Sequence, residues 1–333
     1  MPALSWRQKW AEKGGFVADP QGWSLPSKLD IPTKSRRSYV LARILDWVLI
    51  IVCLILTQVF YAYVTKPEIY FNVNDQFYMA PVLPDRVSSF LSTVVSVAIP
   101  IALIVILNLV FYTSWPDMYH AVTGLVQALA MTMVTCSFLW ATIGGLRPYH
   151  ITKCDPDPAK LVAGQLYYTE SVCRTKLEKV DLNGFPSGHA GSAFTCWVFL
   201  SFWMHAKLKP YNGTAQFYKL LVTFIPLIVA GYISLTRIMD FHHTTGQVLT
   251  GMAIGITAAV FAYKLNYPMH GWFYGERHGN GDIPAYVLPR YTPARSGRQT
   301  MPDGTVAPRD YSAEEGSRAN LQNEMSGTAI QVD

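Results

Sequence analysis

The chain has 333 residues, of which half are hydrophobic and only 15% are charged. That composition is too apolar for an ordinary soluble protein of this length, and the apolar residues are too clustered along the chain to form one large core. The net charge of +5 comes mostly from segments that flank the apolar stretches. It therefore reflects membrane topology and gives no indication of nucleic-acid binding.

Six apolar runs follow one another, and each is close to the roughly 20 residues that cross a hydrocarbon core of about 30 Å. One such run could be a buried helix of a soluble protein, but several in succession, with Trp and Tyr near many of their ends, are typical of a membrane protein. The sequence therefore predicts an all-α, polytopic fold with six transmembrane helices. The runs are 47–64, 87–113, 121–146, 190–206, 220–236 and 244–263, and the fourth is interrupted only by His205.

Positive residues gather before the first run, between the fourth and fifth, and after the sixth. Because Lys and Arg are retained in short cytoplasmic segments, both ends of the chain are expected in the cytoplasm. Segments 66–86 and 147–186 and the turn around Asp240 then face the lumen or the exterior. Segment 147–179 is itself basic, which the charge rule would place in the cytoplasm. Its position outside the cytoplasm is therefore assigned from the even number of predicted helices.

The segments outside the apolar runs are polar and rich in Pro, Gly, Ser and Arg. We expect flexible cytoplasmic tails at 1–40 and 266–333, with the six-helix membrane domain at 41–265. No signal peptide is expected, since the residues before Val40 have no short apolar core. An internal repeat and mid-membrane charges are not apparent, which makes a transporter less favoured.

The five cysteines divide by location. Cys53, Cys136 and Cys196 fall inside apolar runs, where a thiol packs as a small hydrophobe. Cys154 and Cys173 share the long segment after the third run. An oxidising compartment would permit a disulfide between them, and free thiols are the alternative, whereas zinc would need further ligands nearby.

The tetrapeptide Pro186-Ser187-Gly188-His189 immediately precedes the fourth run. Ser187 is expected at or near the N-cap of this helix, and Gly188 would let the backbone approach a bound group. Free amides at a helix N-terminus favour an anion. The alternative is a loop that only ends and caps a membrane helix.

Two arginines lie on the same predicted face as this tetrapeptide. Arg147 follows the third run and Arg237 follows the fifth. A guanidinium group offers a fork of donors that suits a tetrahedral phosphate, although either arginine taken singly could extend to lipid headgroups. Together with Ser187 and Gly188, the two arginines are our candidate phosphate-binding residues.

His243 opens the sixth run after His242 and is the candidate nucleophile on phosphorus. A phosphohistidine intermediate would form while His189 protonates the departing alkoxide. The alternatives are that His242 and His243 only cap a helix or bind a metal. No third ligand stands at metal spacing, so no metal is expected.

Together these residues resemble the type 2 phosphatidic acid phosphatase family, and most nearly its fungal diacylglycerol pyrophosphate phosphatase branch. The resemblance covers about residues 40–264. The family pattern is Lys, six residues, Arg-Pro; then Pro-Ser-Gly-His; then Ser-Arg, five residues, His, three residues, Asp. Only the middle part is intact in this chain, and the order of the three parts matches.

The resemblance implies that Arg147, Arg237 and Ser187 belong to the phosphate site, that His189 is the general acid and that His243 is the nucleophile. It also implies that no divalent metal is needed, and no cofactor is expected. The substrate is expected to be a lipid phosphate in the lumenal or exoplasmic leaflet of an endomembrane (vacuole, Golgi or endoplasmic reticulum) or of the plasma membrane.

Two positions depart from the pattern, because Trp140 stands at the family's lysine and Gln247 at its aspartate. Gln247 lies one helical turn from His243, so its carbonyl can still hold one tautomer, but it supplies no negative charge. Lys153 or Arg174 could provide the missing cation from the long segment.

The predicted function is metal-independent hydrolysis of phosphatidate, lysophosphatidate, diacylglycerol pyrophosphate or a sphingoid phosphate through a phosphohistidine, weakened by the loss of Lys and Asp. One alternative is a catalytically silent family member that binds phospholipid or a partner protein through the same cavity. Another is a transferase, since an alcohol can attack a phosphohistidine in place of water.

Overall fold

The computed structural model describes residues 33–62, 68–112, 115–208, 210 and 216–267. The predicted tails fall almost entirely outside these ranges, at 1–32 and 268–333, so the domain boundaries stay a prediction. The described residues form helices and loops, and their strand-like pairing is limited to three isolated bridges. The predicted all-α fold class is confirmed.

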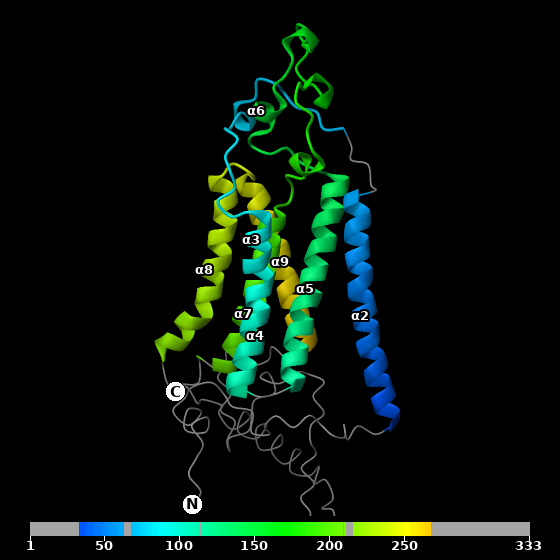
Figure 1. Cartoon of the computed structure of the whole chain (residues 1–333), viewed down its shortest axis with the longest axis vertical. Coiled ribbons are helices and arrows are strands. Elements are labelled where there is room, and N and C mark those ends of the chain that lie inside the picture. Colours follow the sequence, from blue (N-terminus) through cyan, green and yellow to red (C-terminus); the bar gives the residue numbers. More distant parts are fainter. Residues whose placement is uncertain (1–32, 63–67, 113–114, 209, 211–215, 268–333) are drawn as a thin grey trace, which may run out of the picture. The chain divides into compact units, whose positions relative to one another are not determined.

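Long helices, drawn side by side in Figure 1, make up the membrane part. Five stretches are long and apolar enough to cross a membrane: 40–62, 89–111, 117–142, 217–239 and 245–266. The protein is thus a multi-pass membrane protein. The long helices are α2 (Thr33–Ala62), the composite helix α3 (Ser89–Thr93), η2 (Val94–Ala98), α4 (Ile99–Leu107) and η3 (Asn108–Tyr112), then α5 (Trp115–Thr142), α7 (Gly188–Leu208), α8 (Phe217–Met239) and α9 (Thr245–Asn266).

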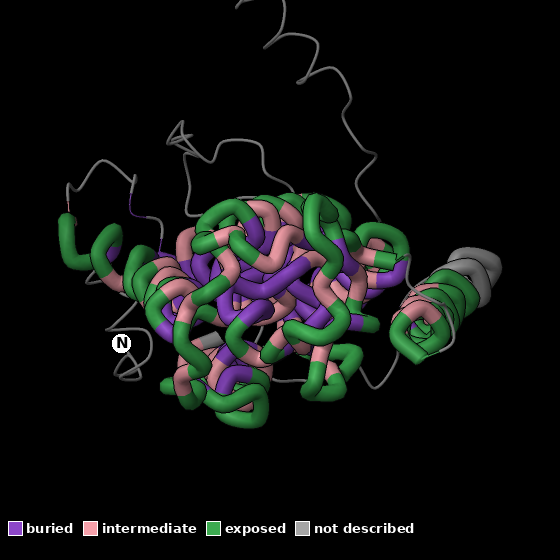
Figure 2. Tube along the Cα trace, turned by 90° about the horizontal axis from the view of Figure 1, so that it is seen from above, coloured by how far each residue is buried: buried purple, intermediate pink, exposed green. Residues whose placement is uncertain are grey.

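Helix α7 corresponds to the predicted fourth span but is not among these five stretches. Most of its side chains are buried, and it packs against α5, α8 and α9. A helix surrounded by other helices does not have to present an apolar surface to lipid, which explains its more polar sequence. Figure 2 shows the buried residues gathered at the centre of the helices, with exposed residues around them. The count of six spans stays a prediction.

Helix α2, in contrast to α7, is barely buried by the rest of the protein. It begins at Thr33, earlier than the predicted domain boundary at 41, and it packs on α5. Only 6% of its most apolar window is buried by the rest of the protein. Its hydrophobic side chains are therefore available to lipid tails.

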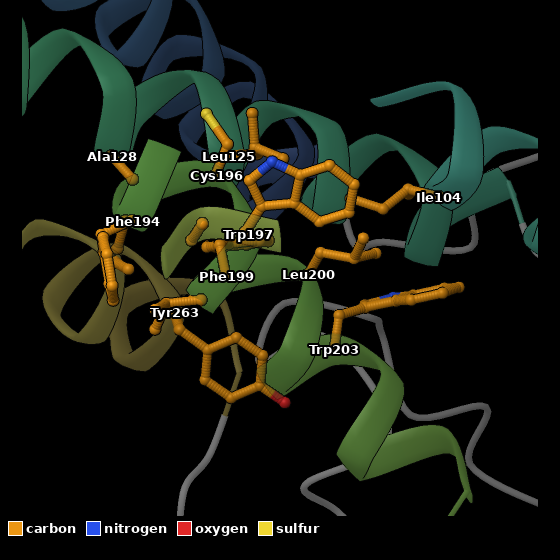
Figure 3. Close-up of a cluster of buried hydrophobic side chains, with 14 of the residues drawn as sticks. Ile104, Leu125, Ala128, Phe194, Cys196, Trp197, Phe199, Leu200, Trp203 and Tyr263 are labelled. Carbon is orange, nitrogen blue, oxygen red and sulfur yellow. The ribbon is translucent and has the colours of Figure 1, made fainter. Parts of the chain in front are cut away.

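The core lies around α7. Trp197 and Trp203 of this helix, together with Phe199, belong to one buried cluster with Ile104 and Tyr263 (Figure 3). Helices α7 and α9 approach closely, because Gly251 and Gly255 of α9 lie against the backbone at and near the start of α7. A side chain at either glycine would collide with that backbone, so the small residues set the distance between the two helices.

At one end of the helices, segments 68–88 and 143–187 form a cover of short helices and loops (Figure 1). A second apolar cluster, which includes Phe71, Ile151 and Tyr168, joins the two segments. Phe71 and Tyr168 also exchange two backbone hydrogen bonds of 2.9 Å. Cys154 and Cys173 form a disulfide, which decides between the two alternatives left by the sequence. The short helices are η1 (Gln76–Tyr78), α6 (His150–Cys154), η4 (Pro158–Lys160), η5 (Glu170–Val172) and η6 (Lys179–Leu182).

Candidate active site

The three sequence motifs meet at the covered end of the helices and are joined by hydrogen bonds. The backbone N–H of Gly184 donates to the carbonyl of Gly145 at 2.9 Å, and that of Ser187 donates to the carbonyl of Gln247 at 3.0 Å. The Gln247 side chain donates through Nε2 to the carbonyl of Leu146 at 2.8 Å. The segments around Arg147, His189 and His243 are thus held together at the point where α5 ends and α7 and α9 begin.

His243 lies in the turn before α9 and is only 3% exposed. Its Nδ1 is 2.8 Å from the carbonyl oxygen of Gly184 and 3.3 Å from Oε1 of Gln247. Both neighbours accept hydrogen bonds, so Nδ1 carries the proton and Nε2 keeps its lone pair. Burial first, and then the charge of Arg147, hold the pKa of His243 well below its usual value. The ring is therefore neutral near pH 7, which is the form that a nucleophile requires.

Gln247 has a structural role of its own. Its Oε1 accepts from the Thr244 N–H at 3.0 Å, and the Thr244 hydroxyl oxygen accepts from the Gln247 N–H at 3.3 Å, so the two residues form a capping box at the start of α9. An aspartate could accept in this turn but could not donate to Leu146. The departure from the family pattern thus exchanges a negative charge for a link between two motifs.

Trp140 and Gly188 fit together at the start of α7. The indole Nε1 of Trp140 donates to the carbonyl of Pro186 at 2.8 Å. A Cβ atom at Gly188 would lie 2.8 Å from Cζ2 of the Trp140 ring, closer than side chains normally approach. Ser187 occupies the N-cap position as predicted, and its Oγ accepts from the Ala190 N–H at 3.4 Å. The residue at the lysine position therefore holds the turn that carries His189.

Arg147 follows α5 and is 8% exposed. Its Nε donates to the carbonyl of Val180 at 3.0 Å. Among the described residues, no carboxylate oxygen lies within 4.0 Å of its guanidinium nitrogens. In addition to burial, its charge lowers the pKa of His189, His242 and His243, so Arg147 lies within electrostatic range of all three histidines. Within the described ranges, this cation therefore has three histidines in electrostatic range and no carboxylate partner.

Arg237, at the end of α8, is 1% exposed and has several partners. Its Nη1 donates to Oδ1 of Asp85 at 2.8 Å, and its Nη2 donates to the carbonyl of Val87 at 2.9 Å and faces Oδ2 of Asp240 at 3.4 Å. The charge of Arg237 also acts on His189. Both predicted arginines therefore act electrostatically on this histidine. Among the residues that the structure describes, Arg237 has carboxylate partners and Arg147 has none.

Sequence reasoning did not identify Asp85 as part of this cluster and treated Asp240 only as a turn residue. Asp240 is 1% exposed and accepts from both the backbone N–H and the Nε of Arg86 at 2.9 Å. The sequence did contain one indication of their role. Asp85 and Arg86 come just before the second apolar run, on the same predicted membrane face as the motifs.

Asp85, Asp240 and His242 present ligand atoms that lie within 4.8 Å of one another. Each carboxylate already faces a guanidinium group, so a cation would have to displace Arg237 from Asp85 or Arg86 from Asp240. The two arginines fit this arrangement better than a metal does. The expected independence of metal stays a prediction.

The proposed substitutes for the missing lysine bind elsewhere. Lys153 donates to Oδ1 of buried Asp181 at 2.7 Å. Arg174 lies 3.7 Å from Asp155 and 3.6 Å from Asp157, and its side chain is largely exposed. Both cations therefore stabilise the long loop in this structure, and a role for either in phosphate binding stays untested.

Comparison with known proteins points to one family. Residues 121–269 match the PAP2 superfamily. A PA-phosphatase related-family protein of Dictyostelium discoideum is 31% identical over 70% of this chain and 72% of its own length. Lipid phosphate phosphatase 1 of Arabidopsis thaliana is 29% identical over 67% of this chain and 68% of its own. Diacylglycerol pyrophosphate phosphatase 1 of Saccharomyces cerevisiae is 29% identical over 68% of this chain and 80% of its own length. No solved structure matches the chain.

Proposed function

The chain belongs to the type 2 phosphatidic acid phosphatase family, and on this basis we propose that it hydrolyses lipid phosphates through a phosphohistidine intermediate. Its relatives include proteins named lipid phosphate phosphatase and diacylglycerol pyrophosphate phosphatase. Phosphatidate, lysophosphatidate and diacylglycerol pyrophosphate are the proposed substrates.

The observation that carries the proposal is the environment of His243. The carbonyl of Gly184 accepts from Nδ1 at 2.8 Å, which leaves the Nε2 lone pair for phosphorus. In the first step Nε2 attacks phosphorus, and the bond from phosphorus to the lipid oxygen breaks. His189 gives a proton to that oxygen. Burial, Arg237 and Arg147 lower the pKa of His189 to about 4 in the free site, so this role requires that the negative charge of the bound phosphate raise it again. Arg147 and Arg237 bind the phosphoryl oxygens and stabilise the charge that they carry in the transition state.

In the second step a water molecule attacks the phosphohistidine. His189, now neutral, takes a proton from this water, and the P–N bond breaks so that its electron pair returns to Nε2. Phosphate leaves, and both histidines are restored to their starting protonation states. The Gly184 carbonyl stabilises the Nδ1 proton throughout, as the family's aspartate would do with a full negative charge.

The site lies where α5 ends and α7 and α9 begin, next to the disulfide-bonded loop. A disulfide persists in oxidising compartments, which supports a lumenal or exoplasmic position for this end of the protein. An endomembrane or the plasma membrane would both satisfy this condition. Substrate would then enter from the leaflet on that side.

The test is release of phosphate from phosphatidate and diacylglycerol pyrophosphate by the purified protein in detergent, with a chelator present. We expect His243→Ala to fall below about a thousandth of the wild-type rate, because it removes the nucleophile. Gln247→Asp is measured beside it, together with thermal unfolding, because this change also removes the donor to Leu146. Full activity in His243→Ala would overturn the mechanism.

The same experiment separates the two alternatives. An inactive wild type together with an active Gln247→Asp variant would mean a silenced site that binds phospholipid or a partner protein. Loss of substrate without release of free phosphate, when an acceptor alcohol is present, would mean a transferase.

A further inference from the structure

The loop before the composite helix α3–η3 contacts the candidate site through three consecutive residues. Asp85 accepts from Arg237, the carbonyl of Val87 accepts from Arg237, and Arg86 binds Asp240 through both its backbone N–H and its side chain. None of these three residues belongs to the family's motif pattern. This loop therefore contributes directly to the environment of Arg237.

Asp85 is the central residue of these contacts. Its Oδ1 accepts from Nη1 of Arg237 at 2.8 Å and lies 3.1 Å from Nε2 of His242. The other ring nitrogen of His242, Nδ1, lies 3.0 Å from the carbonyl oxygen of Asp240. A protonated His242 satisfies both neighbours, because each nitrogen then donates to an oxygen.

We propose that Asp85 is a positioning residue of the phosphate site: it orients Arg237 toward the phosphate, and protonated His242 holds Asp85 in place. The inference rests on the proposed function, since it assigns phosphate binding to Arg237. It deepens that function by adding a fourth segment to the site and by linking the orientation of an arginine to a histidine outside the catalytic pair.

The charges around Arg237 support positioning. Arg237 and Arg86 face Asp85 and Asp240, so two positive and two negative groups compensate one another. Arg147, without a carboxylate partner among the described residues, is left to compensate an incoming phosphate. Arg237 can then contribute through donors that remain available while Asp85 keeps the plane of its guanidinium group fixed.

The link to His242 makes the arrangement dependent on pH. Burial lowers the pKa of His242 below its usual 6.5, Arg147 and Arg237 act in the same direction, and Asp85 opposes them. The ring also contacts Tyr149 edge to face at 5.4 Å, and it lies within electrostatic range of His189. When the pH rises through this pKa, Nε2 loses its proton and presents a lone pair to Oδ1 of Asp85. Asp85 is then held less firmly, so phosphate affinity falls.

The test measures binding of inorganic vanadate by its shift of the unfolding temperature, together with KM and kcat for phosphatidate. We expect Asp85→Ala to weaken vanadate binding and raise KM by about tenfold, the effect of one charged hydrogen bond, with a smaller change in kcat. Asp85→Asn keeps an oxygen acceptor for Arg237 but loses the charge, so its KM should lie between those of Asp85→Ala and the wild type.

The matched control is Asp75→Asn in the same loop. Asp75 accepts from the Phe77 N–H at 3.0 Å and, in the part of the chain that the structure describes, forms no hydrogen bond or ion pair with Arg237 or His242. It should leave vanadate binding unchanged. Unchanged binding in both Asp85 variants, or tighter binding as expected if Asp85 competes with phosphate, would overturn the proposal.

The pH dependence provides the second arm. The ratio of the His242→Asn affinity for vanadate to the wild-type affinity should rise with pH between about 5 and 7.5, since only the wild type loses the His242 proton. A ratio that stays constant would contradict the role of His242. The ionisation of vanadate itself cancels in this ratio. Because vanadate binding is read without turnover, failure of this proposal is distinct from failure of the phosphohistidine mechanism.

Discussion

Helices α5 and α7 carry a buried polar cluster at each end, and the two clusters differ in how their charges are satisfied. At the end opposite the candidate site, the carboxylate of Asp117 accepts from Lys207 at 2.8 Å, from Asn108 at 2.9 Å and from Tyr267 at 3.0 Å. The charged atoms of this cluster are paired with side chains of the helices themselves. Such a cluster stabilises one arrangement of the helices.

The candidate site contrasts with this cluster. Arg147 has no carboxylate within 4.0 Å among the described residues, and the geometry of His243 leaves its Nε2 with a lone pair. Many of the fixed contacts come from backbone carbonyls, such as those of Gly184, Val180 and Val87. A polar cluster whose charges are all paired stabilises the fold, whereas one that leaves a cation such as Arg147 without a carboxylate can accept an anionic ligand.

The largest effect on stability should come from the complete cluster. Lys207→Met would leave Asp117 buried without a cation and should cost about 3–5 kcal/mol of unfolding free energy, seen as a lower unfolding temperature in detergent. Adding Asp117→Asn to this variant should recover part of the loss. Activity per folded molecule should be preserved in both. A loss of activity larger than the loss of folded protein would mean that the two ends are coupled.

Arg147→Met should lower activity strongly and stability only slightly, the reverse of Lys207→Met. We expect kcat to fall by about 10²–10³, as for other preorganised donors to a reacting oxygen. The loss of stability should be small, because Arg147 forms no ion pair with the described residues. Arg147→Lys retains the charge but not the fork of donors, so its kcat should lie between those of Arg147→Met and the wild type. Phosphate release and thermal unfolding of the same preparations measure both effects. Equal activity of all three proteins would remove Arg147 from the site.

Gly188→Ala tests the contact that replaces the family's lysine. The new methyl group would meet the ring of Trp140 and should cost about 1–3 kcal/mol. The cost should fall when Trp140→Leu is already present, so the double-mutant cycle should show coupling between the two positions. Additive effects on the unfolding temperature would contradict the close contact.

The pH dependence of kcat should reflect the low pKa of His243. Because burial and Arg147 favour the neutral ring, the nucleophile persists as the pH falls, and the acid limb assigned to it should lie below pH 6.5. The measurement is kcat for phosphatidate between about pH 4 and 8 at saturating substrate. An acid limb above 6.5 would require a cationic His243 in the resting site.

The smallest effect is expected for Arg174→Ala. This side chain is largely exposed and lies at the long distances of 3.6–3.7 Å from its two carboxylate partners. Stability should change by less than about 0.5 kcal/mol and phosphate release by less than about twofold. A large loss of activity would instead support Arg174 as the substitute for the missing lysine.

Local pattern was sufficient for the helices and for much of the candidate site. Apolar length predicted the membrane helices, and the N-cap position of Ser187 followed from residue type alone, because both depend on neighbours along the chain. The meeting of Arg147, Arg237 and His189 also followed from topology, since an odd number of helices separates segments on opposite faces and an even number returns the chain to the same face.

The sequence by itself determined that this is a multi-pass, all-α membrane protein with a set of candidate catalytic residues at one end of its helices: two arginines, a histidine pair and a capped helix N-terminus. Only the tertiary structure decided that Gln247 links two motifs, that Trp140 holds the turn before His189, and that Asp85 binds Arg237. These contacts join residues far apart in the chain, and their partners are often backbone carbonyls, which every residue possesses. No pattern of residue types can therefore reveal them before the chain is folded.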